Sequence, residues 1–238
     1  MSGHSKWATI KRKKATIDAK RGKLFSRLSK EISVAARSGG DISFNPRLRL
    51  LVDKAREANM PMDNITRAIK KGTGELPGAQ YEAQLYEGYG PFGIAVMVDT
   101  LSDNKNRTVA EIRRIFTVKS GSLGESGSVN WMFAKLGVVQ ATGTGVTEDE
   151  LLEKLIDFDI KDIAHDENVF TITCDTKSVE PIKNLVASLG LKVESAEVEW
   201  VAQNTTQLST EQAEKAYEFL NELEEHDDVQ NVYTNLTT

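Results

Sequence analysis

The sequence predicts an α+β protein, with an N-terminal helical bundle followed by two ferredoxin-like α/β sandwich domains, the last inserted into the middle one. Three observations support this fold class. Near residue 79 the spacing of apolar residues changes from steps of three and four to steps of two. Residues 134–206 contain the elements of a complete sandwich. A helix and a strand are left over at the C-terminus.

Residues 1–78 are expected to form a basic helical domain of three short amphipathic helices. The first helix is indicated by apolar residues at steps of three and four and stops at Gly39-Gly40. Asn45-Pro46 begins the second helix, because Asn caps helices and Pro is tolerated at their first position. The third helix is expected to end at Gly72, a typical C-terminal stop.

Residues 79–133 and 207–238 are expected to form one discontinuous α/β domain. The first part predicts two strands, a helix over 106–118 and a Gly/Ser loop over 120–128. It is short of a helix and a strand. The C-terminal part supplies both, with a helix over 210–225 and a strand over 229–233. The chain is therefore predicted to return and complete the earlier sheet.

Residues 134–206 are expected to form the inserted ferredoxin-like domain, in the order strand, helix, strand, strand, helix, strand. A strand at Val138-Val139 comes first, and Thr147 with Glu150 forms a capping box that opens a helix to Phe158. The second helix ends at Gly190. All four strands belong to this unit, so its sheet has no place for the C-terminal strand.

The composition is that of an ordinary globular protein, with 39% hydrophobic and 27% charged residues in 238 positions. The single cysteine, Cys174, excludes an internal disulfide. No apolar run approaches the roughly 20 residues that span a bilayer, so no membrane partner is expected. The basic N-terminus lacks the apolar segment of a secretory signal, whereas its composition alone leaves a mitochondrial transit peptide as an alternative.

Charge is divided unevenly along the chain, although the formal net charge is only -5. Residues 1–78 hold 18 Lys or Arg and 7 Asp or Glu, a net of +11. Residues 79–238 hold 12 and 28, a net of -16. Such a division points to a nucleic-acid or membrane-surface partner for the basic part. The acidic part should repel phosphate, so any polyanion is expected to contact the first third.

No catalytic or metal-binding set can be assembled from the sequence, and no enzyme, cofactor or metal is expected. His4, His165 and His226 lack the spacing of metal ligands. Cys174 ends an apolar strand and is interpreted as a buried structural thiol. Two pairs of carboxylates, Asp99 with Asp103 and Asp157 with Asp159, are interpreted as strand ends and helix starts rather than catalytic dyads.

The basic N-terminal segment is the strongest candidate site. Ser2 to Lys23 carries eight Lys or Arg against one acid. Such cations bind phosphates with release of counterions, whereas a plain solvated face is the alternative interpretation. Trp7 offers either a stacking surface for an unpaired base or an anchor into the helices. The candidate nucleic-acid-binding residues are Lys6, Trp7, Lys11, Arg12, Lys13, Lys14, Lys20, Arg21, Lys23, Arg47 and Arg49.

Two further segments are less specific. The basic set of the second helix, extended by Lys54 and Arg56, is either a continuation of the patch or the polar side of that helix. The loop over 120–128 has donors suited to phosphate but is equally well interpreted as a simple connection.

Four stretches carry a resemblance to the YebC/PmpR family: GHSKWATIKRKKATIDAKRGKLFSRL, NPRLRLLVDKAREANMPMDNITRAIKKGTGE, YEGYGPFGIAVMVDTLSDNKNRTVAEIRRIF and GSLGESGSVNWMF. They cover most of residues 3–133. The resemblance implies a three-domain cytoplasmic bacterial protein. Members are described mostly as probable DNA-binding transcriptional regulators, and the family includes a mitochondrial translational activator of cytochrome oxidase.

Two functions therefore follow from the resemblance and the charge together. One is DNA binding in transcription regulation. The other is a translation factor that docks on ribosomal RNA, with the ribosome as its partner. No helix-turn-helix and no aromatic RNA-binding sheet is evident, which argues against strong direct base readout. A monomer is expected, because no apolar stripe is left unassigned.

Overall fold

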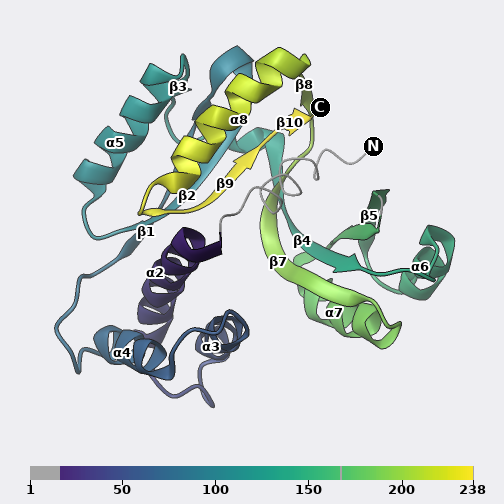
Figure 1. Ribbon diagram of the computed structural model, residues 1–238, viewed down its shortest axis with the longest axis horizontal. Helices are drawn as coiled ribbons and strands as arrows, with labels where there is room; N and C mark the ends of the chain where they lie inside the picture. The colour runs from purple at the N-terminus through teal and green to yellow at the C-terminus, as the bar shows by residue number, and fades with distance from the viewer. Residues whose placement is uncertain (1–16, 167, 238) are drawn as a thin grey trace.

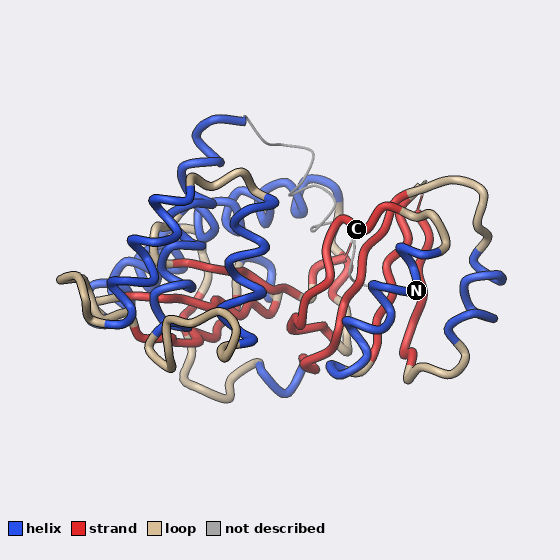
Figure 2. The backbone as a smooth tube through the Cα atoms, turned by 90° about the horizontal axis from the view of Figure 1, so that it is seen from below, coloured by secondary structure: helices blue, strands red, loops and turns tan. Residues whose placement is uncertain are grey.

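The computed structural model describes residues 17–166 and 168–237 (Figure 1). In this part of the chain, three helices come first, and two four-stranded antiparallel sheets with their own helices follow. Figure 2 shows the strands as two groups that run in different directions. The predicted α+β fold class is confirmed. No helix in the described ranges is long and apolar enough to cross a membrane.

The helical region, residues 17–78, contains α2 (Ile17–Ala36), α3 (Pro46–Glu57) and α4 (Met62–Thr73). Asn45 caps α3 as expected, because its side chain accepts a hydrogen bond from the Leu48 N–H at 3.0 Å. Apolar residues of all three helices form one core, with Leu28, Ile32 and Ile65 almost fully buried.

The predicted end of the third helix at Gly72 is wrong. Helix α4 continues to Thr73, and Gly74 ends it in the left-handed conformation with φ 83°. Gly72 has a packing role instead, because a Cβ there would lie 2.3 Å from the Ser33 carbonyl oxygen on α2. The missing side chain allows α2 and α4 to approach closely.

The first sheet has the strand order β3-β1-β2-β9. Residue Val98 on β2 pairs with Val232 on β9, so the predicted return of the C-terminus to the earlier sheet is confirmed. Two helices, α5 and α8, bury one face in a core that includes Phe116 and Phe219. The bounds are β1 (Glu82–Tyr89), β2 (Ala95–Ser102), α5 (Lys105–Val118), β3 (Ser122–Leu123), α8 (Thr210–Glu225) and β9 (Val229–Thr234).

The second sheet has the order β5-β6-β4-β7, which is the strand order of a ferredoxin-like sandwich. The capping box of Thr147 and Glu150 is present, but its helix ends at Leu155 rather than Phe158. The first strand is much longer than Val138-Val139. The bounds are β4 (Phe133–Thr142), α6 (Glu148–Leu155), β5 (Ile160–Asp166), β6 (Val169–Cys174), α7 (Val179–Ser188) and β7 (Lys192–Ala202).

The second sheet joins the first through the ends of β4 and β7. The Gln203 N–H donates to the Met132 carbonyl at 2.8 Å, so the chain enters and leaves the insertion at one place. Beside it, Met97, Phe133 and Trp200 belong to an apolar cluster on the face of the first sheet that α5 and α8 leave uncovered.

The exact division of the chain into domains at residues 78, 133 and 206 stays a prediction.

The remaining elements are short. They are the strand pair β8 (Thr206–Gln207) and β10 (Leu236–Thr237), and the 3-10 helices η1 (Pro91–Gly93), η2 (Asn130–Met132) and η3 (Thr176–Ser178).

Candidate nucleic-acid interface

The predicted site residues fall into two groups. Six of them lie outside the described residues: Lys6, Trp7, Lys11, Arg12, Lys13 and Lys14. The other five lie on two helices of the helical region: Lys20, Arg21 and Lys23 on α2, and Arg47 and Arg49 on α3. The first turns of α2 therefore carry the end of the basic N-terminal segment.

The two described side chains on the first turns of α2 have different surroundings. Arg21 is exposed, whereas Lys23 is half-buried. Burial lowers the pKa of Lys23, and the positive charge of Arg27 lowers it further. The carboxylates that act on Lys23 in the opposite direction are Glu225, Asp227 and Glu224, at the end of α8. Lys23 therefore lies toward the protein and is the weaker candidate for a phosphate contact.

On α3, the two predicted arginines also differ. The Arg49 guanidinium donates from Nε to the Ile42 carbonyl at 3.0 Å and from Nη2 to the Ser43 carbonyl at 2.8 Å. It thus holds the connection between α2 and α3, a role that sequence spacing could not reveal. Arg47 is exposed and makes no ion pair with another described residue.

The two cations that would extend the patch on α3 are already paired. Lys54 Nζ lies 2.5 Å from Glu197 Oε1 on β7, which joins the helical region to the second sheet. Burial lowers the pKa of Lys54, but the charge and hydrogen bond of Glu197 and the charges of Glu31 and Glu199 together outweigh burial and raise it. Arg56 pairs with Asp53 at 3.2 Å on the same helix. Lys54 is therefore better described as a structural contact than as a free phosphate ligand, whereas Arg56 forms an exposed ion pair within its own helix.

Four further cations of the helical region are exposed, and sequence reasoning did not include them in the site. They lie at the end of α2 and on α4, and none pairs with a carboxylate inside the ranges 17–166 and 168–237: Arg37, Arg67, Lys70 and Lys71. The signal was available in the sequence, because the exposed positions of α4 follow directly from the helical spacing of its buried residues.

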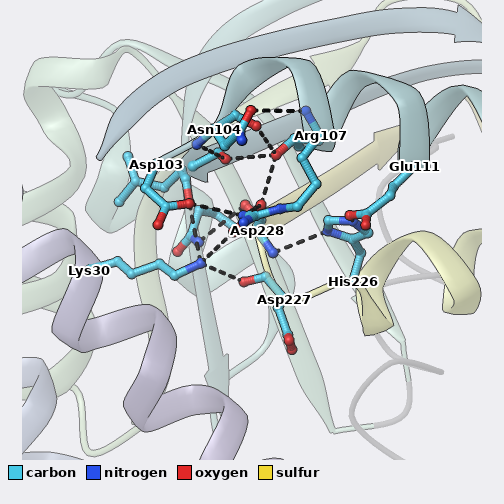
Figure 3. Close-up of polar contacts among 12 residues, drawn as sticks. Lys30, Asp103, Asn104, Arg107, Glu111, His226, Asp227 and Asp228 are labelled. Atoms are coloured by element: carbon cyan, nitrogen blue, oxygen red, sulfur yellow. Dashed lines mark hydrogen bonds and ion pairs between the residues drawn. The ribbon is translucent and has the colours of Figure 1, made fainter. Parts of the chain in front are cut away.

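A buried carboxylate holds α2 against the first sheet. The Asp228 side chain, only 5% exposed, accepts hydrogen bonds from three donors on two helices (Figure 3). Lys30 Nζ on α2 lies 2.7 Å from Oδ1, and Oδ2 accepts from Arg107 Nη2 at 2.8 Å and Thr108 Oγ1 at 2.7 Å. Burial alone would raise the pKa of Asp228, but these donors outweigh it and hold the pKa well below its usual range.

Two backbone contacts support the same junction. Lys30 Nζ also donates to the Asp227 carbonyl at 2.9 Å, and Arg27 Nη2 donates to the Glu224 carbonyl at 2.6 Å. Both carbonyls lie where α8 ends and the chain turns into β9. Helix α2, and with it the attachment point of the basic segment, is therefore fixed by side-chain and backbone contacts together.

His226 connects the junction to α5. Its Nδ1 accepts a hydrogen bond from the Asp228 N–H at 3.1 Å. The ring hydrogen therefore lies on Nε2, which donates to Glu111 Oε2 at 2.8 Å (Figure 3). This histidine has a structural role at the corner between α8 and β9.

The described residues do not bring together a set suited to covalent or metal chemistry. No group of three or more His, Cys, Asp or Glu within 17–166 and 168–237 could hold a metal ion. Cys174 is buried as expected, and burial raises the pKa of its thiol to about 11. Chemically, the helical region can present fixed positive charge.

Comparison with known proteins gives a consistent result over almost the whole chain. Residues 5–75 match the TACO1/YebC protein N-terminal domain, and residues 81–236 match the TACO1/YebC second and third domain. A probable transcriptional regulatory protein of Chlorobaculum tepidum is 52% identical over 238 residues, which cover 99% of this chain and 95% of the relative. One of Chlorobaculum parvum is 51% identical with the same coverage.

A solved structure is similar over the same length. The crystal structure of a conserved hypothetical protein from Aquifex aeolicus has a TM-score of 0.86 and 46% sequence identity. The similarity covers 98% of this chain and 97% of that one. Sequence and structure thus agree, and the chain belongs to the TACO1/YebC family.

Proposed function

We propose that this protein is a nucleic-acid-binding regulator, specifically a DNA-binding transcriptional regulator without enzymatic activity. It contacts the phosphate backbone through the basic N-terminal segment, residues 2–23, and through the helical region to which that segment is attached. The proposal also includes that the protein is a monomer and that it acts in the cytoplasm. An unpaired thiol such as Cys174 stays reduced in that compartment.

The single observation that carries the proposal is the excess of positive charge in the helical region. Residues 17–78 hold 13 Lys or Arg against 7 Asp or Glu, and the segment before them adds further cations. Exposed cations such as Arg21, Arg47 and Arg67 make no ion pair with another described residue, so they can exchange counterions for phosphates. The relatives' names, which describe probable transcriptional regulatory proteins, support the regulatory part.

The anchoring of α2 gives this positive charge a defined place on the molecule. Because Asp228 and two backbone carbonyls hold α2, its first turns have a fixed position relative to the first sheet. Fixed cations lose less conformational freedom on binding than cations on a free chain. The contacts are with phosphates, so they position the nucleic acid and carry little sequence information.

The test is a titration of a promoter fragment and of a scrambled duplex of equal length at several salt concentrations. In the variant, Lys11, Arg12, Lys13 and Lys14 are all replaced by Ala. We expect weaker binding to both duplexes and a salt dependence whose slope falls by up to about 4, because each lost phosphate contact removes about 0.9. Unchanged affinity would contradict the proposed role of the segment.

A matched control removes the same number of charges elsewhere. Lys154, Lys161, Lys177 and Lys192 are exposed residues of the second-sheet region, and their replacement by Ala changes the net charge equally. This control variant should bind DNA more tightly than the variant with residues 11–14 replaced. Equal losses in the two would mean that only net charge matters, not the segment.

Two further outcomes bear on the transcriptional part. If promoter and scrambled duplex bind equally at physiological salt, specific regulation at that promoter is contradicted. Crosslinking and sequencing of bound nucleic acid in living cells identifies the target directly. Recovery of ribosomal RNA in place of promoter DNA would replace DNA by RNA as the target.

A further inference from the structure

Outside the helical region, the excess of negative charge is confined to residues 136–238. Residues 136–238 hold 6 Lys or Arg and 22 Asp or Glu, a net of -16. Residues 79–135, by contrast, hold 6 of each and are neutral. They form the β1–β2 hairpin, α5, β3 and the loop that follows. The net charge of residues 79–135 therefore does not repel a polyanion from the edge of the first sheet that β3 forms.

Two aromatic side chains are exposed together at this edge. Trp131 is 63% exposed and Tyr89 is 39% exposed. The Trp131 indole N–H donates to the Ser128 carbonyl at 3.2 Å, and the Tyr89 hydroxyl donates to the same oxygen at 3.3 Å. The polar ends of both rings are thus held at one atom, while much of their apolar surface faces water. Large aromatic surface left in water is typical of a binding site.

The loop that carries this carbonyl is itself fixed by a buried carboxylate. Glu87 on β1 is 3% exposed and accepts three backbone N–H groups. Its Oε1 accepts from Gly127 at 3.0 Å, and its Oε2 accepts from Val129 at 3.0 Å and Asn130 at 2.9 Å. The peptide of Ser128 lies between these anchored positions. The two rings are therefore oriented before any ligand arrives.

We propose that Tyr89 and Trp131 form a platform on which an unpaired base of the bound nucleic acid stacks. The inference rests on the proposed function and adds to it a class of ligand, because only a single-stranded segment offers a free base. Every base has an aromatic face, and a fixed aromatic side chain on the protein can stack against it regardless of sequence. The platform lies outside the basic segment, so the two contacts act on different parts of one strand.

An arginine-rich protein is the other class of partner that stacks on aromatic rings. Such a partner needs carboxylates close to the rings. In the loop over 120–131, Glu125 is the only acidic residue. The neutral charge of residues 79–135 therefore favours a nucleobase over a cationic peptide.

The experiment compares a labelled 20-nucleotide oligo(dT) with a 20-base-pair duplex, using the full chain. We expect Trp131→Ala to weaken binding of the single strand about 5- to 100-fold, in line with the loss of one stacked base. Duplex affinity and the salt slope for both ligands should not change, because no phosphate contact is lost. Trp131→Phe keeps an aromatic face and should recover most of the single-strand affinity.

Controls separate this result from loss of folding. Ile156 on the second-sheet region is 77% exposed, and Ile156→Ala removes a similar exposed apolar group without effect on either ligand. Thermal unfolding of Trp131→Ala should be close to that of the unaltered protein, because Trp131 is 63% exposed.

The outcomes distinguish the two proposals. If Trp131→Ala binds oligo(dT) as the unaltered protein does, while the fourfold variant of residues 11–14 binds it more weakly, the platform is overturned and the proposed function stands. If the unaltered protein binds neither ligand, both proposals fail. If Trp131→Ala loses binding of an oligo-arginine peptide but keeps all nucleic-acid binding, the surface is a protein contact and the platform is overturned.

Discussion

Lys30 and Asp228 are separated by 198 positions in the chain, yet Lys30 Nζ lies 2.7 Å from Asp228 Oδ1. Their side chains are only 14% and 5% exposed. The contact joins α2, which carries the end of the basic segment, to the start of β9. The orientation of the candidate interface therefore depends on a residue near the C-terminal strand rather than on the helical region alone.

Replacing Asp228 by Asn should loosen this junction. The substitution keeps the size of the side chain but leaves the largely buried Lys30 without this countercharge. We expect the free energy of unfolding to fall by about 2 to 4 kcal/mol, and the amide hydrogens of α2 to exchange faster. Urea unfolding and hydrogen exchange measure the two effects.

A suitable control for Asp228→Asn is Asp53→Asn. Asp53 forms an ion pair with Arg56 on α3, but the two side chains are 52% and 49% exposed. Such a pair contributes little, and its loss should cost about 0.5 kcal/mol or less. A similar cost at both positions would show that burial of Asp228 does not matter.

The contribution of Asp228 should also depend on pH. Its pKa is lowered in the folded protein, so its charged form stabilises the fold at every pH above the value of about 4 for a free Asp. As pH falls below 4 toward the lower folded-state pKa, this stabilisation is lost. The difference in unfolding free energy between the unaltered protein and Asp228→Asn should shrink accordingly. Urea titrations at pH 7, 4 and 3 test this, and a constant difference would contradict it.

Gly72 and Gly74 should respond differently to substitution by Ala, although they lie two positions apart. At Gly72 the added Cβ would lie 2.3 Å from the Ser33 carbonyl oxygen and 2.6 Å from the Ala36 Cβ, so α2 and α4 must separate. We expect a loss of about 2 to 3 kcal/mol, as for an overpacked core. At Gly74 there is space, and only the left-handed φ of 83° costs about 1 kcal/mol. Thermal unfolding ranks the two, and the reverse order would refute the packing role.

Replacing Glu87 by Gln should release the loop that holds Trp131. A glutamine side chain has one acceptor oxygen where the carboxylate has two, so at least one of the three bound N–H groups loses its partner. We expect a destabilisation of about 1 to 3 kcal/mol and faster amide exchange at Gly127, Val129 and Asn130. Glu125→Gln in the same loop changes an exposed side chain and should leave these amides protected.

Local signals explain why much of the fold could be predicted. The caps Asn45 and Thr147 each form the hydrogen bonds that their sequence patterns indicate, because a cap involves only neighbours in the chain. The return of β9 could be predicted from the apolar content of a strand that had no place in the second sheet.

Other features depend on residues that meet only in the folded chain. Strand β4 begins at Phe133, five positions before the predicted Val138, because β7 pairs with it from Phe133 onward. This pairing joins segments that lie far apart in the sequence. The packing role of Gly72, the countercharge of Lys30 and the anchoring by Glu87 likewise have no sequence signature. The sequence predicted a basic surface as the candidate site. The structure shows which of its described cations are exposed and which already form contacts within the protein.

The pairing of Val98 with Val232 has a consequence for how the protein assembles during synthesis. The first sheet lacks an edge strand until β9 has been made, whereas the whole second sheet can form earlier from continuous sequence. Until then β2 presents an unpaired edge to the surroundings, which is a site for aggregation. Lys30 on α2 likewise has no countercharge from Asp228 until that residue has been made. A chain that ends before Asp228 therefore lacks the contact that holds α2, and with it the proposed basic surface, against the first sheet.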